Sequence, residues 1–350
     1  THMDNSMAWR VANQPWMPIT QPRDRGSSSH YADGVYHARG EPSLPNPRAV
    51  SRTIMRGEQG VPSSSNRTVL SVFFGQHVMD EIVDTRRAGC PVEFLNIYVP
   101  PQDPVFNSNS RSNVMVLFRS QWDKSTGVST SNPRLQTNSV TAWLDGSSIY
   151  GTSHVWCSAL RTFQDGLLTT GKDPSLPPVS KQRLRMQRNP PPAPEITPEN
   201  RDIIYAFGNP WGNESPFLRV LGTVWLRFHN FQAKQMKDDH PDWSDEEIFL
   251  TARKWVIAVY QVYTPLNMQC YKMFVDPSIS VEFQVAAMKF GHTMVPPGVY
   301  RRNSSCDFKP FSLRNGSAER LCNTFWERKV EMHFSIGKTI SCFIVPLTVL

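Results

Sequence analysis

The stretch SPFLRVLGTVWLRFHNFQAKQM, residues 215–236, decides the fold class. Ser215 has the side chain of an N-cap, and Pro216 follows at the first helical position, where its missing N–H is harmless. Apolar residues then recur at helical spacing and form a single stripe, at Phe217, Leu218, Leu221, Val224, Trp225 and Phe228. The stretch therefore predicts a long helix with one buried face.

Other segments carry the same period. A capping box of Ser244 and Glu247 begins a second long helix over 244–261. Further helices are predicted over 67–84, over 154–163 and over 281–294, where Val285, Met288 and His292 share one face. Residues 91–135 have the pattern of loops and short strands, and 170–200 form a proline-rich connection. We predict a mainly α fold with long irregular loops.

Composition limits the classes of function. Net charge is +7 and the densest basic run is 181–188, which lacks interleaved aromatic residues, so it indicates a solvated loop and no nucleic-acid partner. None of the six cysteines forms a CxxC pair, which excludes the usual zinc and thioredoxin motifs. The apolar C-terminal stretch is too short to cross a bilayer, so the chain is expected to be soluble. The sequons at Asn66, Asn213, Asn303 and Asn315 suit an extracellular glycoprotein.

His292 has two readings on the residues alone. It ends an apolar helical stretch just before Pro296–Pro297, as a core or surface histidine could. The alternative is a metal ligand, because neutral imidazole is a common ligand of iron, copper and zinc.

Longer motifs resemble the animal haem peroxidase superfamily. These are GNPWGNESPFLRVLGTVWLRFHN (208–230), HPDWSDEEIFLTARKWVIA (240–258), FVDPSIS (274–280) and KFGHTMVPPGVYRRN (289–303). Within it, YADGVY (31–36), NRTVLSVFFGQHV (66–78), GCPVEFLNI (89–97) and 131–151 resemble the peroxidase-homology ectodomain of dual oxidases. The resemblance implies an incomplete helical peroxidase-like domain over 31–325, between an N-terminal tail (1–30) and a divergent C-terminal tail (326–350).

The resemblance also implies a haem site with an altered distal side. His292 in Gly291–His292 matches the proximal iron ligand of the family, and Gln76 and Glu214 match distal-side positions. However, Asp80 stands where the family has its distal histidine, Trp211 stands where it has its catalytic arginine, and Met79 replaces the haem-linking aspartate. Peroxidase chemistry needs a base and a fixed cation, and an ionised Asp80 replaces an imidazole poorly. Efficient peroxidase catalysis is therefore not expected. Haem binding is expected to be loose, because Met79 cannot form the ester link that the resemblance implies.

A calcium site is the second implied feature. Its ligands by resemblance are Thr141, Trp143, Asp145, Ser147 and Glu81, and the alternative is an ordinary Asp–Gly turn. The implied partners are the membrane NADPH oxidase module of the parent protein and a dual-oxidase maturation factor. The implied location is the extracellular face of the plasma membrane or the endoplasmic reticulum.

Three functions remain open at this point. The first is a weak or non-catalytic haem-binding module that supports a hydrogen-peroxide-forming oxidase. The second is an active haem peroxidase that oxidises tyrosine or halide with hydrogen peroxide. The third is a fragment without activity of its own.

Overall fold

The computed structural model describes residues 21–22, 31–40, 42–56, 61–65, 67–85, 91–106, 113–180, 184, 204–263, 277–300 and 318–325. Within these ranges the chain is mainly helical, which confirms the predicted fold class. The sequons at Asn66, Asn303 and Asn315 lie outside the described residues, as do the C-terminal tail and nearly all of the N-terminal tail.

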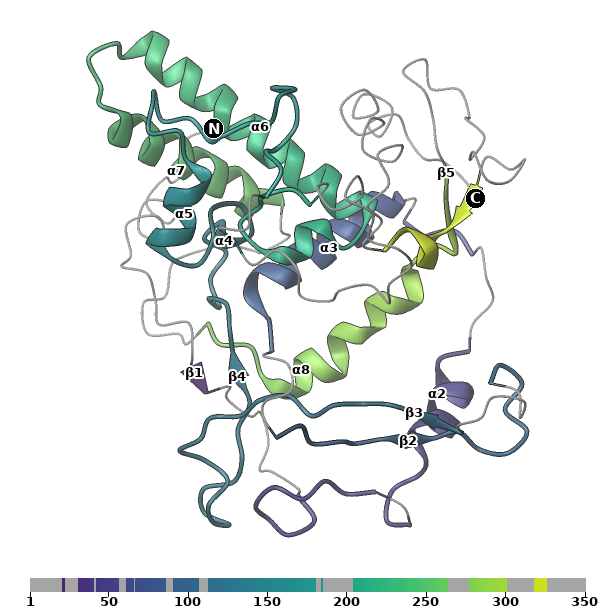
Figure 1. Ribbon diagram of the computed structural model, residues 1–350. Helices are drawn as coiled ribbons and strands as arrows, with labels where there is room; N and C mark the ends of the chain where they lie inside the picture. Colours follow the sequence, from purple (N-terminus) through teal and green to yellow (C-terminus); the bar gives the residue numbers. More distant parts are fainter. Residues whose placement is uncertain are drawn as a thin grey trace.

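Two long helices form an antiparallel pair at one end of the molecule (Figure 1). α6 spans Pro216–Asp239, and Ser215 caps it by accepting a hydrogen bond from the Leu218 N–H. α7 spans Asp245–Tyr263. Its capping box is formed as predicted, because Ser244 Oγ accepts from Glu247 N while the Glu247 carboxylate accepts from Ser244 N.

α3, Val69–Ile82, packs across α6 and carries the candidate distal residues. Its buried Phe73 ring stacks on Phe217 at a centroid distance of 4.1 Å. The short helices α4 (Ser147–Tyr150) and α5 (His154–Leu160) complete the core beside α6 and α7. The 3-10 helix η2, Pro210–Asn213, leads into α6 and contacts it.

The last predicted helix is not continuous. Residues 281–294 form a short α-helix, α8 (Val281–Val285), followed by the 3-10 helix η3 (Ala287–Met294). The backbone leaves helical geometry at Ala286, after which Lys289 N bonds to Ala286 O in the i to i+3 pattern. With three residues per turn, Lys289 and His292 share a face, and the predicted grouping of His292 with Val285 and Met288 was wrong.

The strands are short and pair only two by two within the described residues. The antiparallel pairs are β1 (Gln21–Pro22) with β4 (Thr137–Asn138), β2 (Ile97–Tyr98) with β3 (Val114–Met115), and β5 (Gly298–Tyr300) with β6 (Ala318–Arg320). The remaining elements are α2 (Pro47–Ile54) and the 3-10 helix η4 (Leu321–Thr324). Across these ranges, no helix combines the length and apolar character needed to cross a membrane.

Candidate haem and calcium sites

Two of the predicted distal residues meet where α3 lies beside the turn between η2 and α6. Gln76 on α3 donates a hydrogen bond from Nε2 to Glu214 Oε2 at 2.6 Å. Glu214 directly follows η2, and Trp211 lies within it, partly buried. Gln76 and Asp80 are one helical turn apart on α3, so both face this contact. The structure therefore gathers the four positions that the sequence assigns to the distal side.

Asp80 differs from its predicted state. Its Oδ2 is buried and has no hydrogen-bond partner among the described residues. Burial raises the pKa of the Asp80 carboxyl well above its usual range, Glu214 and Asp84 raise it further, and only Lys289 opposes them. The sequence led us to expect an ionised Asp80, whereas its surroundings favour the protonated form, because three acids share a poorly hydrated region there.

His77 does not replace the missing distal histidine. Its side chain is buried, and Nε2 lies 3.3 Å from Ser148 Oγ, while the ring packs edge-on against Tyr260. Burial lowers the pKa of His77 to about 4. The imidazole is thus neutral and directed into the α4–α7 side of the core.

His292 is exposed on η3, which contacts α3. Partial burial and the charge of Lys289 lower the pKa of His292, so the ring is unprotonated at neutral pH. No described residue hydrogen-bonds to it, which does not fit a satisfied core histidine. The neighbouring Gly291 is open, since a Cβ there would meet nothing within 4 Å. A neutral, unpartnered imidazole beside open backbone fits an axial ligand for haem.

The predicted calcium ligands converge on one loop. The Asp145 carboxylate accepts hydrogen bonds from Thr141 Oγ1 at 3.1 Å and from Ser147 N at 3.0 Å. The Trp143 carbonyl oxygen lies 3.4 Å from Thr141 Oγ1, and the Glu81 carbonyl oxygen lies 3.4 Å from Ser147 Oγ. All five predicted positions therefore lie together, although they come from α3 and from a loop about 60 residues later.

The Glu81 side chain closes this cluster. Its carboxylate accepts from Gly146 N at 2.7 Å and from Ser148 Oγ at 2.5 Å, and the residue is fully buried. Burial and, after it, the charge of the nearby Asp145 together raise the pKa of Glu81 to about 8, and burial also raises the pKa of Asp145. Two buried carboxyl groups so close together fit a site in which oxygen ligands surround a divalent cation.

In the described ranges, no three His, Cys, Asp or Glu side chains surround one point. The predicted calcium loop instead combines two carboxylates with hydroxyl and carbonyl oxygens. The Asp–Gly turn is present as well, with Gly146 at φ +76°. A Cβ on Gly146 would lie 3.0 Å from the Tyr150 ring, so the turn requires glycine twice over.

The sequon at Asn213 is not available for glycosylation in the folded chain. Asn213 is fully buried at the end of η2. Its side-chain amide exchanges two hydrogen bonds with the backbone of Tyr205, each 2.9 Å long. The prediction of a glycan at this position was wrong, because the asparagine is a structural clamp between the 204–207 segment and η2.

One buried polar group carried no signal in the sequence. His229 of α6 lies 2.8 Å from the Tyr150 hydroxyl through Nδ1 and 2.9 Å from the Gly166 carbonyl through Nε2. Because a carbonyl only accepts, Nε2 carries the proton and the tyrosine donates to Nδ1. The three residues lie far apart in the chain, so no motif spacing could identify them.

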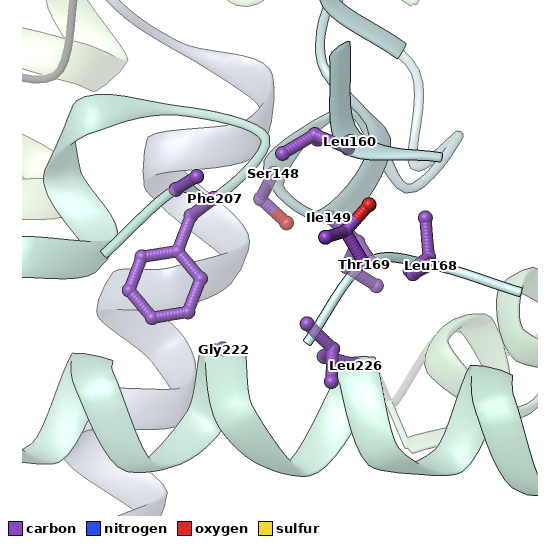
Figure 2. Close-up of a pocket in the computed structure, with 9 residues that line it drawn as sticks. Ser148, Ile149, Leu160, Leu168, Thr169, Phe207, Gly222 and Leu226 are labelled. Carbon is purple, nitrogen blue, oxygen red and sulfur yellow. The ribbon is translucent and has the colours of Figure 1, made fainter. Parts of the chain in front are cut away.

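A small cavity lies beside this core and is not the haem site. Figure 2 shows Phe207 standing over Gly222 of α6, with Ser148 and Leu160 across the space. The cavity has room for no more than about one water molecule. The predicted distal residues and His292 do not line it.

The sequence matches the family model described as animal haem peroxidase over residues 10–345. It is 51% identical over 316 residues to dual oxidase 1 of Homo sapiens, an alignment that covers 85% of this chain and 20% of that protein. It is 39% identical over 333 residues to the dual oxidase of Drosophila melanogaster, covering 91% of this chain and 21% of that protein. The chain thus spans about a fifth of the length of these relatives.

The fold is similar to that of a solved peroxidase. Peroxidase A from Dictyostelium discoideum superimposes with a TM-score of 0.68 at 22% identity, covering 89% of this chain and 61% of that one. At this identity the likeness shows the fold alone.

Proposed function

The chain belongs to the animal haem peroxidase family, and from that premise we propose that it is a haem-binding, peroxidase-like module of the dual-oxidase type with little peroxidase activity of its own. The module would support a hydrogen-peroxide-forming oxidase. The NADPH oxidase portion of such a protein and its maturation factor are the partners that this proposal implies.

One observation supports weak activity more than any other. The position of the distal base holds Asp80, and burial, Glu214 and Asp84 raise the pKa of its carboxyl, which favours the protonated form. A protonated carboxyl can donate a proton but cannot take one from a peroxide. Glu214 already accepts a hydrogen bond from Gln76, and the position of the distal cation holds the uncharged Trp211. Among these groups none supplies the required base and cation together.

The residues on the proximal side, around His292, fit haem. His292 would hold the iron through its unprotonated imidazole, and open Gly291 would let the ring plane approach the backbone. Haem, when bound, supplies an iron centre that reacts with peroxides. Met79 offers no carboxylate for a covalent link, so the haem would be held by His292 and apolar contact alone.

Restoring the distal pair tests this function. Haem added to the chain should give a Soret shift that His292→Ala abolishes, and peroxide-driven dye oxidation should stay near the rate of free haem. The double variant Asp80→His, Trp211→Arg should raise that rate by roughly 10²–10⁴, the usual contribution of acid–base catalysis. The gain should vanish when His292→Ala is added. Fast turnover by the unmodified chain would contradict the proposal.

We also propose that the Thr141–Ser147 loop and Glu81 bind calcium in a structural role. Two buried carboxyl groups with raised pKa values support it, because a divalent cation would relieve their repulsion.

A further inference from the structure

A two-stranded ribbon stands at the periphery of the molecule beside α2 (Figure 1). Its ladder extends beyond β2 and β3, since Leu95 N bonds to Leu117 O and Val99 N bonds to Asn113 O. Phe94 and Phe118 are paired, with ring centroids 5.1 Å apart. An isolated two-stranded ribbon is marginally stable in water, and three or more strands are usually needed.

Both faces of this ribbon carry exposed apolar side chains. Paired residues share a face, so Phe94, Phe118 and Tyr98 lie on one and Leu95, Leu117 and Met115 on the other. Tyr98 is 65% exposed and Phe94 is 59% exposed, and all six belong to the exposed class. Contiguous exposed apolar surface of this kind marks an interaction site.

The two edges of the ribbon differ. Odd-numbered residues of the second strand make the ladder hydrogen bonds, so the N–H and C=O groups of Val114, Val116 and Phe118 point outward. In the described ranges nothing hydrogen-bonds to Val116, which is 62% exposed. On the opposite edge, the outward carbonyl of Tyr98 accepts from Asn46 Nδ2, at the N-cap of α2. Within the described residues, each chain therefore offers an open strand edge at Val114–Phe118.

We propose that this edge pairs with the same edge of a second copy of the chain. The strand Val114–Phe118 would lie antiparallel to its twin about a two-fold axis at Val116, and the two ribbons would form one four-stranded sheet. Val114 would then face Phe118 of the other copy, and Met115 would face Leu117. Such β-addition satisfies the free backbone groups and covers neighbouring apolar side chains.

The positions of the charged residues are compatible with this register. The strand contains no charged residue from Val114 to Phe118, and Arg119 would face Asn113 of the other copy. Arg119 is already held by Glu93, with Nη1 3.1 Å from Oε2. No like charges meet, and because the same edge of both copies is used about a two-fold axis, this pairing closes at two copies.

A lipid surface fits less well. The outward N–H and C=O groups of Val114, Val116 and Phe118 would lose their hydrogen bonds to water on entering hydrocarbon, which costs several kcal/mol for each unsatisfied group. A second strand provides partners for these groups, whereas a bilayer core does not.

Light scattering on the full chain tests the pairing. The unmodified chain should form a dimer whose fraction rises with concentration, and Val116→Pro should be monomeric. Proline removes only an outward N–H, so the ribbon itself should persist, as circular dichroism and the melting temperature would show. Val92→Pro is the matched control, at an exposed valine outside the ladder, and should still dimerise.

Cross-linking fixes the register independently. Directly opposed residues of a hydrogen-bonded pair have Cα atoms about 5.5 Å apart, within reach of a disulfide. Val116→Cys should therefore give a covalent dimer under mild oxidation, and Val92→Cys should not. A monomer at every concentration, or a dimer that Val116→Pro leaves intact, overturns the proposal. A monomer that cosediments with phosphatidylcholine vesicles assigns the patch to lipid and overturns it as well.

Discussion

Glu81 is the single residue on which the calcium proposal depends most. At neutral pH and without calcium its carboxyl is largely protonated, since burial raises its pKa to about 8. Glu81→Gln keeps a neutral side chain of the same shape, so stability in a chelator should change by only about 1 kcal/mol. Calcium should raise the melting temperature of the unmodified chain, because it binds the native state, and should not raise that of the variant.

A matched control separates this effect from general charge. Asp242→Asn removes an exposed acid far along the chain and should retain the full rise in melting temperature with calcium. If calcium and chelator give the same melting curve for the unmodified chain, only an Asp–Gly turn remains at residues 145–146.

The residues that make up these sites could be predicted from the sequence, but their protonation states could not. The motif around Gln76 and Glu214 placed both on the distal side, and they hydrogen-bond at 2.6 Å. The raised pKa of Asp80 comes first from its burial and then from Glu214, which lies more than 130 positions away in the sequence. Local pattern carries no information on that environment, so Asp80 was expected to be ionised.

At the scale of elements, Gly222 fixes how closely α6 approaches the 204–207 segment. A Cβ at Gly222 would lie 2.6 Å from the Phe207 ring, and one at Gly212 would lie 2.7 Å from its other side. Because the ring is held from two directions, it cannot yield, and Gly222→Ala should destabilise the chain by about 1–3 kcal/mol. Chemical denaturation should show this as a lower midpoint.

The contrasting variant is Gly75→Ala on α3. A Cβ there meets nothing within 4 Å, and alanine is favoured over glycine inside a helix by about 1 kcal/mol. The two substitutions should thus shift the denaturation midpoint in opposite directions. Equal shifts would mean that helix propensity, and not the contact with Phe207, governs position 222.

The sequence predicted where helices begin better than it predicted where a helix is interrupted. Caps are local, so Ser215 and the pair Ser244–Glu247 could be identified from adjacent residues. The change from α8 to η3 has no local signal, since residues 285–290 contain neither proline nor glycine before Gly291. At the end of α3, Thr85 and Gln284 hydrogen-bond, which ties α8 to a segment about 200 residues earlier. Tertiary contact of that kind overrides helical period.

At the scale of the whole molecule, two buried histidines should make the chain sensitive to acid. Burial lowers the pKa of His77 and of His229 to about 4, from an ordinary value of 6.5. Between pH 4 and pH 6.5 the unfolded chain binds more protons than the native one. The free energy of unfolding therefore keeps the whole contribution of the two histidines above pH 6.5 and loses it as the pH falls toward 4. The loss is on the order of 3 kcal/mol for each histidine.

Glu81 has the opposite sign, because its raised pKa favours the native state at low pH and withdraws that stability as pH rises toward 8. The histidine effect should therefore be measured in the Glu81→Gln background by denaturation at a series of pH values. Adding His229→Gln should flatten the fall between pH 6.5 and 4, since Tyr150 and Gly166 then surround a side chain that does not titrate. His154→Gln, at an exposed position on α5, should leave the fall unchanged. Asp80 and Asp145, whose pKa values are also raised, act in the same direction as Glu81 and are present in both chains. A fall that His229→Gln leaves unchanged would therefore mean that His229 admits a proton without unfolding.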